Sequence, residues 1–157
     1  MPSAKVLPAL AKWDSDAPLA GVVVTEFGQG LSVAFCGRLL ADYGATVIKV
    51  DHNLTGSEAM DAWDPALDAF LNAGKLSVAP DDTTPLGRGL LDHLLQASDI
   101  VVRFGRRLVE VPAVEPGSVD VTISWLGQSG PWSMFLCEEN HREGCSILED
   151  GQFTEIR

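Results

Sequence analysis

The sequence predicts an α/β fold: an open, mainly parallel sheet with flanking helices. Short β-branched runs alternate with segments of helical periodicity between residues 19 and 133. A strand, a helix and a strand follow one another within about thirty residues, and such a βαβ unit places its two strands in parallel. Hydrophobic residues make up 46% of the chain, which is typical of a folded domain and not of a disordered one.

The first βαβ unit lies near the start of this region. Residues 21–26 form the first predicted strand and run into a glycine turn. Ser32 can cap the following helix, Gly44 can end it in the left-handed conformation, and residues 45–50 form the second strand. The apolar positions of this helix fall on one stripe: Phe35, Leu39, Leu40 and Tyr43.

The remaining elements continue the alternation. Asp64-Pro65 begins a short helix that reaches residue 71, and residues 76–79 are a third strand. The clearest helix starts at Thr84-Pro85, and buried strands are predicted at 99–103 and 119–124. The apolar stripe of the clearest helix is Leu86, Leu90, Leu91, Leu94, Leu95 and Ala97. We interpret residues 1–18 as a lead-in segment and residues 134–157 as an acidic tail whose apolar residues follow no clear amphipathic spacing.

Charge and cysteine content exclude several classes of function. The chain has 22 acidic and 11 basic side chains, a net charge of −11, which argues against a nucleic-acid or anionic-membrane partner. No apolar run approaches the ~18–20 residues of a membrane helix, and the start does not resemble a secretory signal, so we expect a cytoplasmic protein. Cys137, His141 and Cys145 stand four apart, but they lack a fourth ligand, and we expect no metal.

Two places in the sequence could hold a phosphate. The turn Gly28-Gln-Gly30 lies between a strand and a helix, where backbone N–H groups and the helix dipole favour an anion. Asp51 stands where a ribose-binding acid would, but Val33 replaces the third glycine of the dinucleotide-binding pattern. Two glycines and one acid match the pattern only weakly, so a plain glycine turn beside a solvated Asp fits at least as well. The basic cluster Arg103-Phe-Gly-Arg-Arg107 follows a buried strand, at the edge where open α/β sheets bind ligands.

Several segments together resemble the opening of class III CoA-transferases, the CaiB/BaiF family. The resemblance covers roughly residues 19 to 132, in the family's order and spacing. The segments are Leu19-Ala-Gly-Val-Val-Val, Phe35-Cys-Gly-Arg-Leu-Leu-Ala-Asp-Tyr-Gly-Ala-Thr-Val-Ile-Lys-Val-Asp51, Asn72-Ala-Gly-Lys-Leu-Ser-Val, Thr84-Pro-Leu-Gly-Arg-Gly-Leu-Leu, Ser98-Asp-Ile-Val-Val and Ile123-Ser-Trp-Leu-Gly-Gln-Ser-Gly-Pro131.

This resemblance implies a Rossmann-like large domain that binds CoA, an interlocked dimer, and CoA transfer between an acyl-CoA and a carboxylic acid. An Asp carboxylate would carry the acyl group as a mixed anhydride and then CoA as a thioester. The positions that fall where the family contacts CoA are Gly30, Leu31, His52, Leu71, Lys75, Arg103 and Phe104. Taken alone, the position of Lys75 favours a solvated lysine near a helix end, and that of Phe104 favours a core aromatic.

The chain also departs from the family pattern. His52 stands where the family usually has arginine, and Arg103 where it has asparagine. Glu139 falls at the distance of the nucleophilic Asp, but its surroundings, residues 136–140, do not resemble the family's sequence there. The catalytic residue is therefore unknown, with Glu139 a candidate by position only.

The sequence thus predicts residues 19–133 to be the CoA-binding half of a class III CoA-transferase, truncated or degenerate, with weak or no activity alone. It would act as a homodimer or with a complementary transferase half. The alternative is a noncatalytic Rossmann-like module that binds a nucleotide or a protein. A nicotinamide oxidoreductase is disfavoured by Val33.

Overall fold

The computed structural model describes residues 16–28, 30–51, 64–104, 117–124, 126–131, 135–137, 145–149 and 152–155. Its centre is a five-stranded sheet in the order β3-β2-β1-β4-β5, in which every neighbouring pair is parallel. The predicted open α/β sheet is confirmed. The strands are β1 (Val23–Phe27), β2 (Thr46–Val50), β3 (Leu76–Val78), β4 (Ile100–Phe104) and β5 (Val119–Ile123).

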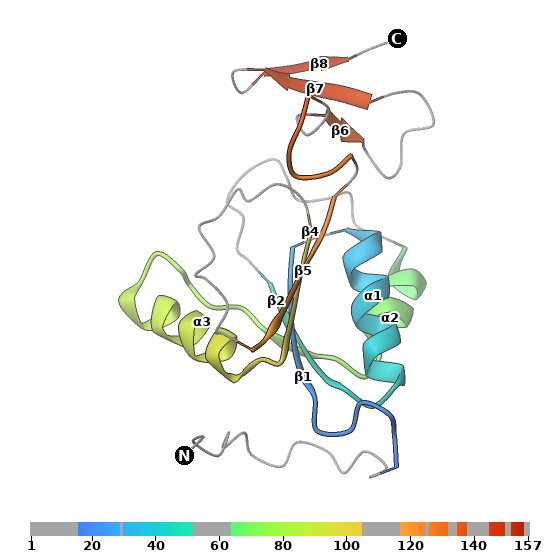
Figure 1. The fold of residues 1–157 in the computed structure, drawn as a ribbon, viewed down its shortest axis with the longest axis vertical. Helices are drawn as coiled ribbons and strands as arrows, with labels where there is room; N and C mark the ends of the chain where they lie inside the picture. The colour runs from blue at the N-terminus through green and yellow to red at the C-terminus, as the bar shows by residue number, and fades with distance from the viewer. Residues whose placement is uncertain are drawn as a thin grey trace.

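Helices cover both faces of this sheet (Figure 1). The helices α1 (Leu31–Asp42) and α2 (Pro65–Asn72) lie on one face, and α3 (Pro85–Ala97) lies on the other. Asp64 and Thr84 cap α2 and α3 as predicted, because their side chains accept hydrogen bonds from the N–H groups of Ala66 (2.8 Å) and Gly87 (3.1 Å). Among the described residues, no helix is long and apolar enough to span a membrane.

The core has one cluster on each face. Side chains alternate between the faces along a strand, so neighbours in sequence enter different clusters. On the α1 face the buried residues are Val24, Val33, Ala41, Ala45, Val47 and Val102. On the α3 face they are Phe27, Val50, Leu91, Leu95 and Val101.

Helix α1 differs from its predicted form in two ways. Its N-cap is Gly30 (φ 151°, ψ 145°), so Ser32 lies inside the first turn and is not the cap. Most of the predicted apolar stripe also faces solvent, since Phe35, Leu39 and Tyr43 are 44%, 43% and 57% exposed, and of its members only Leu40 packs against the core. The buried positions are instead mostly small: Val33, Ala34, Gly37 and Ala41. Small side chains let a helix approach the sheet closely, which leaves the larger ones outside.

The predicted stripe of α3 holds only in part. Leu91 and Leu95 are buried, whereas Leu86 is 86% exposed and Leu90 is 42% exposed. A helix that packs on a sheet buries a stripe of roughly 100° of its surface, so the leucines at the margins of a wider apolar face remain in solvent.

The region predicted as an acidic tail, residues 134–157, contains strands. A second, antiparallel sheet has the order β6-β7-β8, with β6 at Phe135–Cys137, β7 at Cys145–Glu149 and β8 at Gln152–Glu155. Strands of three to five residues offer too few positions for an alternation to show in the sequence. The division of the chain at residues 18 and 133 stays a prediction.

Candidate ligand site at the carboxyl edge of the sheet

The strand order reverses between β1 and β4. From β1 the chain proceeds outward through β2 to β3, and then returns to place β4 and β5 on the other side of β1. In open α/β sheets such a switch point leaves a crevice at the carboxyl ends of the two central strands, and ligands bind there. The register brings Phe27, the last residue of β1, opposite Arg103 of β4.

The glycine turn after β1 forms one side of this switch point. Gly28 and Gly30 have positive φ values of 100° and 151°, which glycine adopts without strain. Gly30 is buried, and its carbonyl accepts the first helical hydrogen bond of α1 from the Ala34 N–H at 3.1 Å. The 12-residue helix that follows directs the positive end of its dipole toward this edge.

Arg103 forms the other side. Arg103 is two residues after Val101 in β4, so both side chains point to the same face of the sheet, the one covered by α3. The side chain is only 10% exposed, and its Nε lies 3.0 Å from Oδ1 of Asp120 in β5. The angle of that contact is too poor for a hydrogen bond, and neither Nε nor Nη2 has a hydrogen-bond partner among the described residues. We regard the contact as an ion pair by proximity that leaves guanidinium donors unused.

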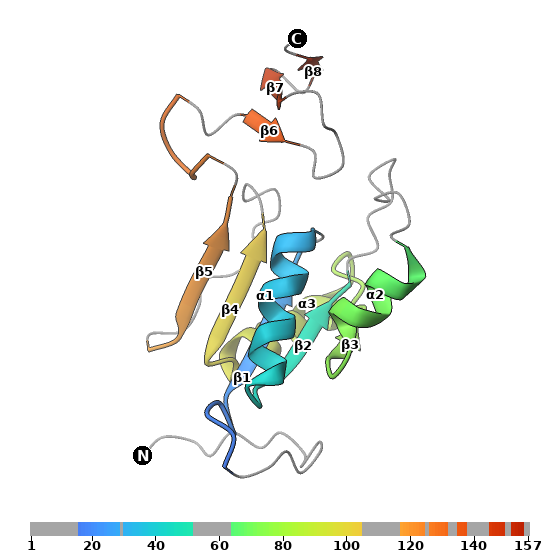
Figure 2. The same ribbon diagram turned by 90° about the vertical axis from the view of Figure 1, so that its right-hand side faces the viewer.

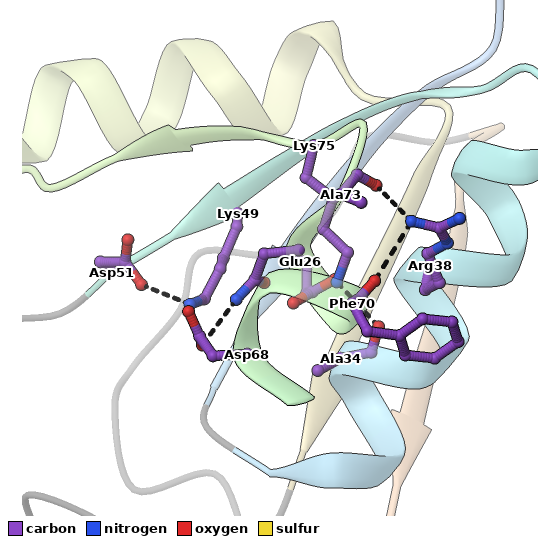
Figure 3. Close-up of polar contacts among 10 residues, drawn as sticks. Glu26, Ala34, Arg38, Lys49, Asp51, Asp68, Phe70, Ala73 and Lys75 are labelled. Carbon is purple, nitrogen blue, oxygen red and sulfur yellow. Dashed lines mark hydrogen bonds and ion pairs between the residues drawn. The ribbon is translucent and has the colours of Figure 1, made fainter. Parts of the chain in front are cut away.

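Lys75 lies elsewhere, beneath α1 (Figure 3). Its Nζ donates to Oε2 of Glu26 and to the Ala34 carbonyl, both at 2.7 Å. The Lys75 and Glu26 side chains are 1% and 0% exposed. Burial raises the pKa of Glu26, against the opposing hydrogen bond and charge of Lys75. Two donors of the ammonium are thus engaged inside the protein.

The structure thus places the Lys75 ammonium apart from Gly30 and Arg103, and the predicted contact of Lys75 with CoA stays a prediction. Gly30 and Arg103 lie at the carboxyl ends of adjacent strands, whereas Lys75 precedes β3 and its ammonium is buried on the opposite face from Arg103. Lys75 is held there by Glu26, which is two residues after Val24 in β1 and, like it, points toward α1. A buried lysine needs such a partner.

The other predicted contacts are placed as follows. Leu31 begins α1 and is 42% exposed, and Leu71 is buried in α2 at 1%. The backbone of Phe104 ends β4 opposite Ile123, and its side chain lies outside the described residues. His52 and Glu139 lie outside them as well.

Asp51 does not stand free for a ribose hydroxyl. Its Oδ1 lies 3.0 Å from Nζ of Lys49, and its Oδ2 accepts a hydrogen bond from the Ser77 hydroxyl. These contacts weaken the nicotinamide-dinucleotide reading further. In the described part of the chain, no group of three or more His, Cys, Asp or Glu side chains is placed to hold a metal ion.

Sequence reasoning missed three residues that shape this region: Glu26, Gly37 and Asp120. A Cβ on Gly37 would lie 1.8 Å from Oε2 of Glu26 and 3.0 Å from Nζ of Lys75, so the ion pair requires glycine there. The one signal was an acid inside the β-branched run of β1, a position where a charge needs a partner from elsewhere in the chain.

Comparisons with known proteins identify the family. Residues 19–137 match the model of CoA-transferase family III. The succinate–glutarate CoA-transferase of Agrobacterium fabrum is 30% identical over 140 residues, which are 75% of this chain and 35% of that protein. The succinyl-CoA–D-citramalate CoA-transferase of Chloroflexus aurantiacus is 33% identical over 134 residues, 73% of this chain and 32% of that protein.

Solved structures agree with these matches. A CaiB/BaiF family protein from Brucella suis superposes with a TM-score of 0.61 at 27% identity, over 74% of this chain and 36% of that one. The Rv3272 protein of Mycobacterium tuberculosis gives the same TM-score of 0.61 at 28% identity, with the same coverage of 74% and 36%. This chain therefore spans about a third of the length of the relatives it matches. The predicted family is confirmed: the chain belongs to CoA-transferase family III.

Proposed function

We propose that this chain binds coenzyme A at the β1–β4 switch point and serves, in the cytoplasm, as the CoA-binding half of a transferase that moves CoA between an acyl-CoA and a carboxylic acid. Family membership and relatives named as CoA-transferases support the reaction class. The observation that carries the site is Arg103, a buried guanidinium with unused donors beside the glycine turn. Buried donors are almost always paired, so an anionic ligand is the partner we assign.

In this proposal the phosphates meet local positive charge, which suits a polyanion on a chain of net charge −11. Gly30 and Leu31 offer the N-terminal end of α1, and Arg103 offers its guanidinium from the facing strand. We keep His52, Leu71 and Phe104 as further contacts from the family resemblance. Lys75 acts indirectly, as argued below.

The chemistry needs a carboxylate nucleophile that forms the mixed anhydride and then the CoA thioester. Glu139 is a candidate by position only. We therefore propose that the nucleophile comes from a complementary transferase half, and that this chain alone has weak or no activity.

The edge strand β5 supports association with such a half. Val119 and Val121 are 55% and 36% exposed and lie opposite Ile100 and Val102, on the α1 face of the sheet. Figure 2 shows α1 over the central strands, with β5 uncovered at the edge. Since the chain spans only 35% and 32% of two relatives, we assign the cover to polypeptide corresponding to the remainder of those proteins. The alternative function, a noncatalytic Rossmann-like module, rests on the missing family pattern around Glu139.

CoA binding to the purified full chain, measured by calorimetry and by thermal shift, tests the site. CoA should stabilise the protein by mass action and NAD should not. Arg103→Gln should weaken CoA binding by about 10-fold or more, since hydrogen bonds to charged groups contribute ~1.5–3 kcal/mol. The matched control is Arg88→Gln, because Arg88 is an exposed arginine on α3 that donates to the Thr83 carbonyl at 3.2 Å.

Equal CoA affinity in the Arg103→Gln and wild-type proteins would remove the proposed site. Transfer of labelled CoA between an acyl-CoA and a free acid then separates the two functions. A chain that binds CoA and shows no transfer even with a complementary family III half would be the binding module.

A further inference from the structure

The ammonium group of Lys75 joins three segments of the chain (Figure 3). Lys75 follows α2 and precedes β3, while its two acceptors are Glu26 in β1 and Ala34 in α1, each at 2.7 Å. Glu26 stands two residues before Gly28, and the Ala34 N–H bonds to the Gly30 carbonyl at 3.1 Å. The strand before the turn and the helix after it are therefore tied to one cation.

This cation is enclosed. The Lys75 and Glu26 side chains are 1% and 0% exposed, and Gly37 of α1 packs so closely that a Cβ there would lie 1.8 Å from Oε2 of Glu26. If Lys75 turned outward to meet a ligand, it would leave a buried carboxylate without its counter-charge, an arrangement proteins avoid. Oε1 of Glu26 already lacks a hydrogen-bond partner, so the carboxylate depends on Lys75.

We propose that Glu26 and Lys75 are positioning residues that hold the β1–α1 glycine turn in the geometry that binds phosphate. This inference rests on the proposed CoA site. Lys75 then affects ligand affinity through the turn and through α1, without contacting the ligand. The alternative is that Lys75 leaves Glu26 and contacts a phosphate itself.

The two mechanisms predict opposite effects of the same substitution. If Lys75 contacts phosphate, Glu26→Gln frees the lysine, and CoA affinity should stay the same or increase. If the pair is a brace, Glu26→Gln loosens the turn and should weaken CoA binding. Lys75→Met weakens binding in either case, so Glu26→Gln is the decisive variant.

Under the brace mechanism the two substitutions are also strongly non-additive. Once one partner is gone the brace is broken, and removing the second also relieves the lone buried charge. The variant Glu26→Gln/Lys75→Met should therefore bind CoA no more weakly than the weaker single variant. Under direct contact, the double variant should match Lys75→Met, with Glu26→Gln at or above wild type.

The experiment measures CoA affinity by calorimetry in the wild-type chain, both single variants and the double variant. Arg38→Met is the control, because Arg38 also ties α1 to α2, through the carbonyls of Phe70 and Ala73 at 3.1 and 3.2 Å, but lies away from the turn. We expect Glu26→Gln and Lys75→Met each to weaken binding by roughly 10-fold, and Arg38→Met to leave it within about twofold of wild type.

Amide hydrogen exchange at residues 28–34 supplies a readout that needs no ligand. Exchange there should accelerate in both single variants and stay at the wild-type rate in Arg38→Met. Unchanged CoA affinity in Glu26→Gln overturns the brace, as does unchanged exchange at the turn. If the wild-type chain does not bind CoA, the proposed function fails, and the exchange data still decide whether the pair holds the turn.

Discussion

Replacement of Gly37 by alanine adds one methyl group where the structure has no room for it. The new Cβ would lie 1.8 Å from Oε2 of Glu26 and 3.0 Å from Nζ of Lys75. Both side chains are buried, at 0% and 1% exposed, so neither can move aside without breaking the ion pair. We expect Gly37→Ala to destabilise the protein.

The magnitude follows from two opposing effects. Separating a buried ion pair so that its charges are uncompensated costs about 3–5 kcal/mol. Alanine in a helix gains about 1 kcal/mol over glycine. The net loss in the free energy of unfolding is therefore about 2–4 kcal/mol, which shifts the urea midpoint by about 1–2 M at a slope of about 2 kcal/mol/M.

Equilibrium urea unfolding followed by circular dichroism measures this loss. The matched control is Gly89→Ala in α3, because nothing lies within 4 Å of a Cβ at Gly89. That variant should be more stable than wild type by about 0.5–1 kcal/mol, since only helix propensity changes. The same substitution at two helical glycines should thus have opposite signs.

A second background tests whether the ion pair causes the loss of stability in Gly37→Ala. In a Glu26→Ala/Lys75→Met background the methyl group of Gly37→Ala has room, so its cost should disappear and the helix-propensity gain should remain. A Gly37→Ala protein that unfolds within about 0.5 kcal/mol of wild type would refute the close packing of α1 on the ion pair. A cost that persists without Glu26 and Lys75 would refute the pair as its cause.

Four further predictions concern other buried or capping groups. Because the hydrogen bond and charge of Lys75 lower the raised pKa of Glu26, Lys75→Met should raise that pKa further in a carbon-13 carboxyl titration; a lower value would contradict the assignment. The pKa of Glu26 is higher in the folded than in the unfolded state, so its contribution to stability is complete below the unfolded pKa and is lost as the pH rises through the folded pKa. The difference in the free energy of unfolding between wild type and Glu26→Gln, measured in urea across this pH range, should show this trend. Ser98 Oγ donates to the Leu94 carbonyl at 2.7 Å, so it accepts from the Thr25 hydroxyl at 2.5 Å. Ser98→Ala leaves the buried Thr25 hydroxyl without an acceptor and should lower the free energy of unfolding in urea by about 1–3 kcal/mol, more than Thr25→Val does. Thr84→Ala removes the N-cap of α3 and should cost about 1 kcal/mol, with Thr84→Ser near wild type in the same assay.

Features encoded by neighbouring residues could be predicted from the sequence. The strands are β-branched runs, and the starts of α2 and α3 are marked by Asp64-Pro65 and Thr84-Pro85. Gly44, with a φ of 94°, ends α1 as expected. Each of these signals acts within a few residues, so one sequence is enough to locate it.

Features that depend on distant residues could not be predicted. Glu26 and Lys75 are 49 positions apart, and no local pattern links them. The inward face of α1 was also misassigned, because large apolar side chains usually face the core, whereas Gly37 lets the helix sit against a buried ion pair and leaves Phe35 exposed. Only the topology, with β1 next to β2 and β4, shows which side chains meet.

The partners of the described cations explain why Arg103 stands apart. Four lysine and arginine side chains of the described segments are engaged: Lys49 with Asp51, Lys75 with Glu26, Arg38 with Asp42, and Arg88 with the Thr83 carbonyl. Arg103 also forms an ion pair, with the 44% exposed Asp120, but it differs from these four because it is buried and its Nε and Nη2 make no hydrogen bond to the described residues.

A ligand anion at Arg103 would therefore accept from guanidinium donors that form no internal hydrogen bond, beside the existing ion pair with Asp120. Because the guanidinium is only 10% exposed, salt should screen this contact far less than a surface ion pair. CoA affinity in the wild-type chain should accordingly fall only slightly between 50 and 300 mM NaCl. A steep loss of affinity over that range would instead place the phosphates on exposed cations, and Arg103 would no longer explain the site.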